Sequence, residues 1–374
     1  MIYLDNNSTT PPLDTVIQSQ LELLSKNHWG NPSSDHQLGS LARLRIENIK
    51  ESLATNLDID SSDAIGFTSG GSEANHKVIS HIVSKTKVIA HSSIEHSSVM
   101  DGYDKFLSND EYQIISISVT TEGTIDLAEL EKNLIQNNVG GLSIQWANSE
   151  TGVIQPIAGI IEICSRNEVL LHVDAAQAMG RINLDPQLLE QIDFLTFTAH
   201  KIHSLKGLGV ICCGKEKSFD TLFPNPHTLN SPAIFALEPS LKLISEPPSE
   251  HLKNLRDSFE SELKIRHPEL IVNGSDAERL PNTTNLSFVG VDGAALVTLL
   301  DQHDVICSQL SACLIGRPEP SYVLTSMGIP EDIARSSIRF SFSKLNTEKE
   351  VETAVEIISK CYSELLTRTQ LIAS

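Results

Sequence analysis

The chain has 374 residues, of which 40% are hydrophobic and 20% are charged, and its formal net charge is −20. This length predicts two domains or one large domain with an appendage, and the composition is that of an ordinary globular protein. The negative charge argues against direct binding to nucleic acid or to an anionic membrane. No apolar run approaches a membrane span of roughly 20 residues, and the first residues do not resemble a signal peptide. We therefore expect a cytoplasmic protein.

Six cysteines are spread along the chain without a Cys-x-x-Cys pair or any other paired spacing. This pattern predicts free cytosolic thiols, with neither a disulfide framework nor a metal site. Each thiol is a candidate nucleophile, and spacing alone does not select one. The six are Cys164, Cys212, Cys213, Cys307, Cys313 and Cys361.

The N-terminal part opens with a polar segment, residues 3–12, that is dense in small hydrogen-bonding side chains. Because so many specific polar groups are unusual in a frayed end, we expect this segment to pack near the functional site. Helical periodicity follows over Leu13–Asn27 and Leu41–Leu57, with a turn at Gly30–Ser34 between them.

Seven short apolar runs then alternate with helical patterns, which predicts an α/β fold with a largely parallel sheet between helices. The seventh run follows the sixth closely, which is compatible with an antiparallel strand. The predicted strands are Ala64–Thr68, Lys87–Ala90, Gln113–Val119, Leu142–Ala147, Val169–Val173, Phe194–Thr198 and Gly209–Cys213. The helices between them are predicted to begin near Ser72, Ser97, Leu127, Ile157 and Pro186.

The proline-rich stretch Glu246–Pro248 is the best candidate for a domain boundary. We therefore predict a large domain, residues 13–247, and a smaller α+β domain made of residues 1–12 and 248–374. The elements predicted beyond the boundary are a helix to about Ile265, the strand Asn285–Val289, the helix Ala294–Gln302, a loop around Cys313, a helix after Pro320, the strand Ile338–Phe342 and a closing helix from Thr347.

Two of the predicted strands end in ionisable residues, since Asp174 closes one and Lys201 follows the next. Ligands of open α/β sheets bind at the carboxyl ends of the strands. A lysine amine can form a Schiff base with pyridoxal phosphate, and an aspartate can keep the pyridine nitrogen protonated, so that the ring stays an electron sink. For these two residues alone, an ordinary acid and a solvated lysine are an equally good interpretation.

Three further strand ends carry polar groups. Gly71 and Ser72 lie in a turn that opens a helix, where free amides and the helix dipole favour phosphate. His96 is placed to stack on a ring or to move protons, and Asn148 to meet a phenolic oxygen. Each feature alone has a structural alternative, such as a plain turn or a satisfied histidine. Five consecutive strand ends of this kind together favour the cofactor hypothesis.

Over nearly its whole length the chain resembles the cysteine desulfurases of the class-V aminotransferase family. These are pyridoxal-phosphate enzymes of fold type I, with a mostly parallel seven-stranded sheet in the large domain. The matching motifs are Tyr-Leu-Asp-Asn at residues 3–6, Gly-Asn-Pro-Ser-Ser at 30–34, Thr-Ser-Gly-Gly-Ser-Glu-Ala-Asn at 68–75, Glu-His-Ser-Ser-Val at 95–99, Asn-Ser-Glu-Thr-Gly at 148–152, Val-Asp-Ala-Ala-Gln at 173–177, Ala-His-Lys at 199–201, Ser-Ala-Cys at 311–313, Glu-Pro-Ser-Tyr-Val-Leu at 319–324 and Ser-Ile-Arg-Phe-Ser at 337–341.

The resemblance implies a role for each residue around the cofactor ring. Lys201 is the Schiff-base lysine, Asp174 pairs with the ring nitrogen, and His96 stacks on the ring. Gln177 and Asn148 address the phenolic oxygen, and Asn148 also contacts the substrate.

The resemblance also implies a phosphate site, a substrate site and a sulfur acceptor. Arg339 matches the arginine that binds the substrate carboxylate, a bidentate task suited to guanidinium. Cys313 matches the catalytic cysteine, and Thr228 stands where the family reaches the phosphate of the partner subunit, after a segment shorter than the family's. The phosphate would be held by Gly71, Ser72, Thr198 and His200.

The implied activity converts L-cysteine to L-alanine and leaves the sulfur on Cys313 as a persulfide, for delivery to an acceptor protein. A homodimer is implied as well. The destinations known for the family are iron–sulfur assembly, tRNA thiolation and DNA phosphorothioation, and the sequence does not choose among them. The alternatives are a C–S lyase, a selenocysteine lyase or an aminotransferase on the same scaffold, or a non-catalytic scaffold in a sulfur relay.

Overall fold

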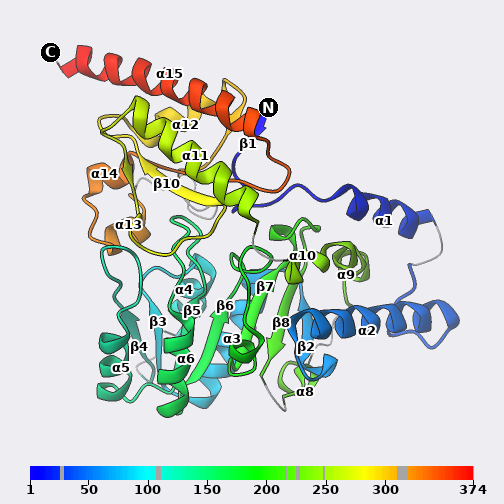
Figure 1. Cartoon of the computed structure of the whole chain (residues 1–374). Helices are drawn as coiled ribbons and strands as arrows, with labels where there is room; N and C mark the ends of the chain where they lie inside the picture. Colours follow the sequence, from blue (N-terminus) through cyan, green and yellow to red (C-terminus); the bar gives the residue numbers. More distant parts are fainter. Residues whose placement is uncertain are drawn as a thin grey trace.

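A computed structural model describes residues 1–25, 29–106, 111–214, 217–224, 228–246, 249–309 and 319–373 of the chain. Figure 1 shows a large sheet with its helices in the lower part of the view, and a smaller group of strands and helices above it. Among the described residues, no helix combines the length and the apolar character that a membrane crossing requires.

The large sheet has seven strands, as predicted. Five neighbouring strands are parallel, whereas β8 runs antiparallel to both of its neighbours. In spatial order the strands are β2 (Ile65–Thr68), β8 (Gly209–Cys213), β7 (Phe194–Thr198), β6 (Leu170–Asp174), β5 (Gly141–Gln145), β3 (Val88–Ser92) and β4 (Gln113–Ile117). The antiparallel direction of β8 follows from its short connection to β7, because a parallel return needs a crossover of a dozen or more residues.

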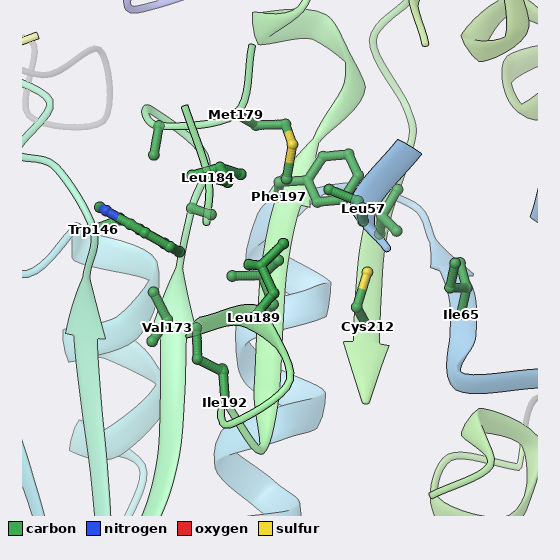
Figure 2. Close-up of a cluster of buried hydrophobic side chains, with 14 of the residues drawn as sticks. Leu57, Ile65, Trp146, Val173, Met179, Leu184, Leu189, Ile192, Phe197 and Cys212 are labelled. Atoms are coloured by element: carbon green, nitrogen blue, oxygen red, sulfur yellow. The ribbon is translucent and has the colours of Figure 1, made fainter. Parts of the chain in front are cut away.

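Helices cover both faces of this sheet, and alternate strand residues enter two different hydrophobic clusters. On β7, Phe194 packs with helices α3 (Gly71–Lys85) and α4 (Ser97–Asp104), whereas Leu195 faces the opposite cluster. That opposite face is covered by α2 (Gln37–Leu57), α5 (Leu127–Gln136) and α6 (Ile157–Arg166). Figure 2 shows part of its core, where Trp146, Val173, Phe197 and Met179 lie close to the strands. Each buried side chain of this size contributes about 1.5–3 kcal/mol to stability.

Shorter helices complete this part of the fold. Helix α1 packs against α9, and α2 contacts both α9 and α10. Their bounds are α1 (Asp14–Ser25), α7 (Pro186–Leu189), α8 (Phe219–Leu222), α9 (Ser231–Leu237) and α10 (Lys242–Ser245), with 3-10 turns η1 (Ser62–Ala64), η2 (Ala199–Lys201) and η3 (Glu238–Ser240).

A second, smaller sheet has its own core. Its antiparallel strands are β12 (Ser337–Ser341), β10 (Thr283–Ser287) and β9 (Ile271–Val272), and β1 (Ile2–Tyr3) pairs nearby with β11 (Val305–Ile306). Ile2 and Leu4 join the hydrophobic cluster formed by residues 252–362, separately from the clusters of the large sheet. The remaining helices are α11 (Glu250–Arg266), α12 (Gly293–Asp301), α13 (Tyr322–Ser326), α14 (Glu331–Arg335) and α15 (Glu348–Ala373).

Most predicted strands differ from the structure by one or two residues at an end, and two of them have a clear physical reason. Strand β4 ends at Ile117, before the predicted Val119, because Val119 already forms an antiparallel bridge with Ile125 in the following turn. Strand β10 begins at Thr283, two residues before the predicted start. Its first residues are polar, but they are buried, and Asn285 donates to the Glu150 carbonyl and accepts from Asn273. An analysis based on apolar runs passes over such a strand start.

Candidate active site

A cavity of about 230 Å³ lies at the carboxyl ends of β5, β6 and β7, where α3 begins and β12 of the smaller sheet contributes Arg339. Most of the residues predicted for the site line it together: Gly71, Ser72, His96, Asp174, Gln177, Thr198, His200, Lys201 and Arg339. The polar segment near the N-terminus also reaches it through Asn7 and Ser8, which confirms the prediction that residues 3–12 pack near the site.

Asp174 is the last residue of β6 and is buried. Its Oδ1 accepts a hydrogen bond from the Ala176 amide at 2.9 Å, and its Oδ2 accepts one from Asn75 Nδ2, also at 2.9 Å. A carboxylate has about four lone-pair positions. Asp174 is therefore held on both oxygens and retains capacity to accept a further donor from the cavity.

Lys201 ends the short turn η2 between β7 and the antiparallel β8. Residue Thr10 holds this turn from outside, since its amide donates to the His200 carbonyl at 2.9 Å and its Oγ1 accepts from the His203 amide at 2.7 Å. His203 itself has a positive φ of 61°, which is uncommon for a residue other than glycine. The N-terminal segment thus fixes the backbone that presents Lys201.

His96 caps the N-terminus of α4 and lies in the cavity wall. Its Nδ1 accepts from the Ser98 amide at 3.1 Å and lies 2.8 Å from Ser98 Oγ. Burial, followed by the nearby Lys201 ammonium, lowers the pKa of His96 to about 4. Since Nδ1 is the acceptor, the neutral ring carries its proton on Nε2, an assignment made from the hydrogen bonds.

One end of the cavity is built from main-chain donors and small side chains. The N-cap residue Gly70 has no side chain to cap α3, so the first amides of the helix, at Gly71 and Ser72, remain available at the cavity wall. Gly209 of β8 lies against this turn, and a Cβ at residue 209 would stand 2.3 Å from the Gly70 carbonyl oxygen. The close approach of the two segments therefore requires a glycine at 209.

The side chains at this end have existing partners. Thr198 donates its hydroxyl to the Leu208 carbonyl at 3.1 Å, and His200 Nδ1 lies 3.1 Å from Thr9 Oγ1. Burial, followed by Lys201, lowers the pKa of His200 to about 4. An anion here would meet a neutral His200 and the amide groups of α3.

Arg339 enters the cavity from β12 and is almost completely buried, with 1% of its surface exposed. Its Nη2 donates to Asp5 Oδ1 at 2.6 Å and to Ser8 Oγ at 2.7 Å, and its Nη1 donates to the Ser149 carbonyl at 3.0 Å. Its Nε has no hydrogen-bond partner among the described residues. A buried donor without an acceptor costs about 1–3 kcal/mol, so this position favours an incoming acceptor.

Two predicted site residues, Asn148 and Thr228, do not line this cavity. Asn148 is buried beside the cavity, but its Oδ1 accepts from the Glu150 and Thr151 amides and does not line the wall. Thr228 lines a different cavity, together with Ser69 and Glu73. Cys313 lies outside the described residues.

Several lining residues were not predicted individually from the sequence. Asn75 and Ser98 contact Asp174 and His96, and Gln145 lines the cavity at the end of β5. The positions of Asn75 and Gly71, four residues apart on α3, place both on one side of the helix. That spacing is the signal by which Asn75 could have been found.

The five cysteines in the described part of the chain are free and buried. Burial raises the pKa of each of these thiols, to about 12 for Cys164 and Cys213. The thiolate is the reactive form, so these five are poorly suited to act as nucleophiles.

Comparison with known proteins gives one consistent result. The profile of the family described as aminotransferase class-V matches residues 2–353. A cysteine desulfurase of Nostoc sp. is 34% identical, over 98% of this chain and 94% of the relative, and the cysteine desulfurase NifS of Azotobacter vinelandii is 30% identical, over 97% and 93%. The solved structure of a NifS-like protein from Rickettsia africae is 32% identical, with a TM-score of 0.86 over 97% of this chain and 99% of its own. The chain therefore belongs to the class-V aminotransferase family, which depends on pyridoxal phosphate, and these relatives are similar to it over nearly their whole length.

Proposed function

We propose that the protein is a pyridoxal-phosphate-dependent cysteine desulfurase. The observation that carries this proposal is the meeting of Asp174, Lys201 and Arg339 in one cavity, from the end of β6, the turn after β7 and strand β12. The full-length similarity to cysteine desulfurases supports the same conclusion.

The donor set in the cavity fits pyridoxal phosphate. The amides at Gly71 and Ser72, with the positive end of the α3 dipole, suit a phosphate dianion. Thr198 and His200 lie at the same end. Thr198 would contact the phosphate by turning its hydroxyl hydrogen away from the Leu208 carbonyl, and His200 through the ring nitrogen that does not face Thr9. When bound, this cofactor supplies an electron sink for the bonds at the substrate Cα.

The residues around the ring have distinct tasks. Lys201 would carry the cofactor and, once released, move the Cα proton of the substrate. Asp174 would accept the pyridinium N–H on the lone pairs that its two existing hydrogen bonds leave open. His96, neutral because of its lowered pKa, would stack on the ring without placing a positive charge beside Lys201. Gln177 and Asn148 would lie on the side of the ring that carries the phenolic oxygen of the cofactor.

Arg339 would bind the carboxylate of L-cysteine. Its Nε has no hydrogen-bond partner among the residues that the structure describes, whereas its Nη2 is engaged with Asp5 and Ser8. Bidentate binding through Nε and Nη2 would therefore require one of these two partners to release Nη2.

Cys313 would take the sulfur. Its thiolate attacks the sulfur of L-cysteine, an S–S bond forms as the C–S bond breaks, and the carbon fragment takes up protons and leaves as L-alanine. The products are L-alanine and a Cys313 persulfide, so atoms and electrons balance without an external oxidant. The buried state of the other five thiols supports this choice.

We further propose a homodimer that acts in the cytoplasm and passes its sulfur to an acceptor protein. Exposed apolar side chains on and between α1 and α2, at the right of Figure 1, support an interface there: Ile17, Leu21, Trp29, Leu41 and Leu44. Thr228 would then reach the phosphate of the partner subunit, since it lies away from the cavity of its own chain. The separate hydrophobic clusters support a large domain of residues 13–247 with a small domain of residues 1–12 and 248–374.

The test is to load the purified protein with pyridoxal phosphate, record its visible absorbance, and measure alanine formed from L-cysteine. Lys201→Ala is expected to lose both the bound-cofactor band and alanine production, whereas Lys206→Ala, at a nearby position outside the cavity lining, retains both. Alanine production by Lys201→Ala at the wild-type rate would contradict the proposal.

A further inference from the structure

A line of polar side chains crosses the face of the large sheet that α3 and α4 cover. On this face the central strands β5, β6 and β7 carry the hydrogen-bonding residues Ser143, His172 and Thr196, and the strand register pairs Thr196 with the apolar Ile211 of β8. All members of the line are buried. From the α4 end to the cavity they are Tyr103, Ser143, His172, Thr196, Asn75 and Asp174.

The outer half of this polar line joins α4 to the two middle strands. Tyr103 Oη lies 2.7 Å from Ser143 Oγ, which in turn lies 2.9 Å from His172 Nδ1. The other ring nitrogen, His172 Nε2, lies 3.0 Å from Thr196 Oγ1. Ser143 and His172 are register partners on β5 and β6, which explains why a short hydroxyl reaches the ring.

The inner half ends on the carboxylate in the cavity. Thr196 Oγ1 lies 2.6 Å from Asn75 Oδ1, and Asn75 Nδ2 lies 2.9 Å from Asp174 Oδ2. The same Nδ2 group also lies 2.9 Å from Ser98 Oγ, the hydroxyl next to His96. Asn75 therefore connects the polar line to both the acid and the imidazole of the site.

The donor and the acceptor of each hydrogen bond in the inner half follow from the Asp174 carboxylate, which accepts hydrogen bonds and does not donate them. Asn75 must present its amide N–H groups to Asp174, so its oxygen faces Thr196, and the Thr196 hydroxyl must donate to that oxygen. Having used its only proton, Thr196 accepts from His172 Nε2–H.

The outer half follows by the same logic. His172 is a neutral imidazole, because burial lowers its pKa to about 4. Its Nδ1 must then accept from the Ser143 hydroxyl, and Tyr103 must donate to Ser143. In each of the five hydrogen bonds, the donor lies on the Tyr103 side and the acceptor on the Asp174 side. Aligned hydrogen bonds polarise one another, so the last donor is stronger than an isolated amide.

We propose that this polar line positions Asp174, by fixing its carboxylate and supplying Oδ2 with an aligned donor, so that the cofactor nitrogen meets a preset acceptor. Tyr103, Ser143, His172, Thr196 and Asn75 act through Asp174 and are positioning residues. This inference rests on the proposed function, since the group that Asp174 would hold is pyridoxal phosphate. A face packed with apolar side chains would serve stability as well, which is why a task at the cavity is the better account of the line.

The test uses Thr196, which lies in the middle of the line and outside the cavity lining. Thr196→Val keeps the shape and removes the hydroxyl, and Thr196→Ser keeps the hydroxyl. Thr284→Val is the matched control, because Thr284 is an equally buried strand threonine whose hydroxyl has no partner among the described residues. Apoprotein is titrated with pyridoxal phosphate by fluorescence, and melting temperatures are recorded beside each dissociation constant.

Thr196→Val is expected to weaken cofactor binding about tenfold, the size of one weakened hydrogen bond to a charged group, and Thr196→Ser to restore it to within about twofold. A Thr196→Val variant that loses melting temperature but binds the cofactor as Thr284→Val does would overturn the inference and leave the proposed function intact. Failure of the wild-type protein to bind the cofactor would instead remove the proposed function and the inference with it.

A second readout needs no cofactor. Nitrogen-15 NMR of the wild-type apoprotein is expected to show His172 with its proton on Nε2, as the direction of the line requires. In Thr196→Val this proton loses its acceptor, and its resonance should shift and exchange faster, whereas Thr284→Val leaves it in place. A proton on Nδ1 in the wild-type protein would reverse the outer half of the line and overturn the inference.

Discussion

Arg339 and Asp5 form a partly buried ion pair, with Nη2 and Oδ1 2.6 Å apart, although 334 positions separate them in the chain. The pair occupies one edge of the guanidinium, and within the described part of the chain Nε has no hydrogen-bond partner. The N-terminal segment thus holds the arginine in place at the cavity wall.

We expect Arg339→Lys to bind L-cysteine at least tenfold more weakly, because a charge-assisted hydrogen bond is worth about 1.5–3 kcal/mol and an ammonium cannot replace the fork of donors. Asp5→Asn should lower the free energy of unfolding by about 1–3 kcal/mol without weakening binding of the substrate, since the amide oxygen still accepts from Nη2. Apparent affinities from alanine release at varied L-cysteine, with urea unfolding, measure the two effects. Equal losses of affinity in both variants would contradict this separation.

Cys313→Ser should retain the cofactor and still bind L-cysteine, because Lys201, Asp174 and Arg339 are unchanged. It should form no persulfide on the protein. Mass spectrometry of the peptide that contains residue 313, after incubation with L-cysteine, makes the measurement, and Cys361→Ser on the buried side of α15 is the control. A sulfur adduct on another cysteine, or undiminished alanine production with free sulfide, would favour a simple C–S lyase.

Gly209→Ala should destabilise the protein by about 1–3 kcal/mol or more and weaken cofactor binding, because the new Cβ would stand 2.3 Å from the Gly70 carbonyl oxygen at the start of α3. Gly70→Ala is the matched control, since its Cβ would meet no atom within 4 Å and its φ of 164° is extended. Urea unfolding measures the free energy of unfolding of both variants, and cofactor titration measures their affinity for the cofactor. Wild-type stability of Gly209→Ala would show that the two turns do not approach so closely.

The free energy of unfolding should decrease as the pH is lowered from 7.5 to 5. His172 has a pKa lowered by burial from 6.5 to about 4, so over this range the unfolded chain takes up a proton that the folded protein does not. The stabilisation is complete above pH 6.5 and decreases toward pH 4, and His172 alone accounts for about 2 kcal/mol between pH 7.5 and 5. His172→Gln apoprotein should therefore lose about 2 kcal/mol less than the wild type in urea unfolding at the two pH values. The exposed His303→Gln is the control, and an equal loss in all three proteins would contradict the prediction.

The sequence predicted the sheet well because its strands are short apolar runs between helices, and the bounds of Phe194–Thr198 and Gly209–Cys213 are as predicted. The seven-stranded sheet and the family were also identified correctly. The polar start of β10 was missed, because buried threonine and asparagine residues satisfied by side-chain hydrogen bonds do not resemble a core strand.

The site residues that follow strand ends could be predicted, because parallel strands bring their carboxyl ends to one edge. The contacts that those residues make could not be predicted from the sequence. Asn148 turns back onto its own loop, and Asp5 reaches Arg339 only because the segment after β1 forms a bridge from Asp5 to Ser341 of β12. Ser143, His172 and Thr196 face one side of three neighbouring strands, which becomes visible only when the strand order and register are known.

The N-terminal segment has a consequence for synthesis on the ribosome. Asn6 donates to the Ser341 carbonyl at 2.8 Å, 335 positions later, and Leu4 accepts from the Ser341 amide. At about 5–20 residues per second, the first residues emerge well over ten seconds before their partner strand exists. The large sheet can form during translation, but the turn that carries Lys201 receives its final support only after the last strand has been made. A nascent or truncated chain that stops before β12 would therefore lack both Arg339 and the anchor of the segment that holds the turn.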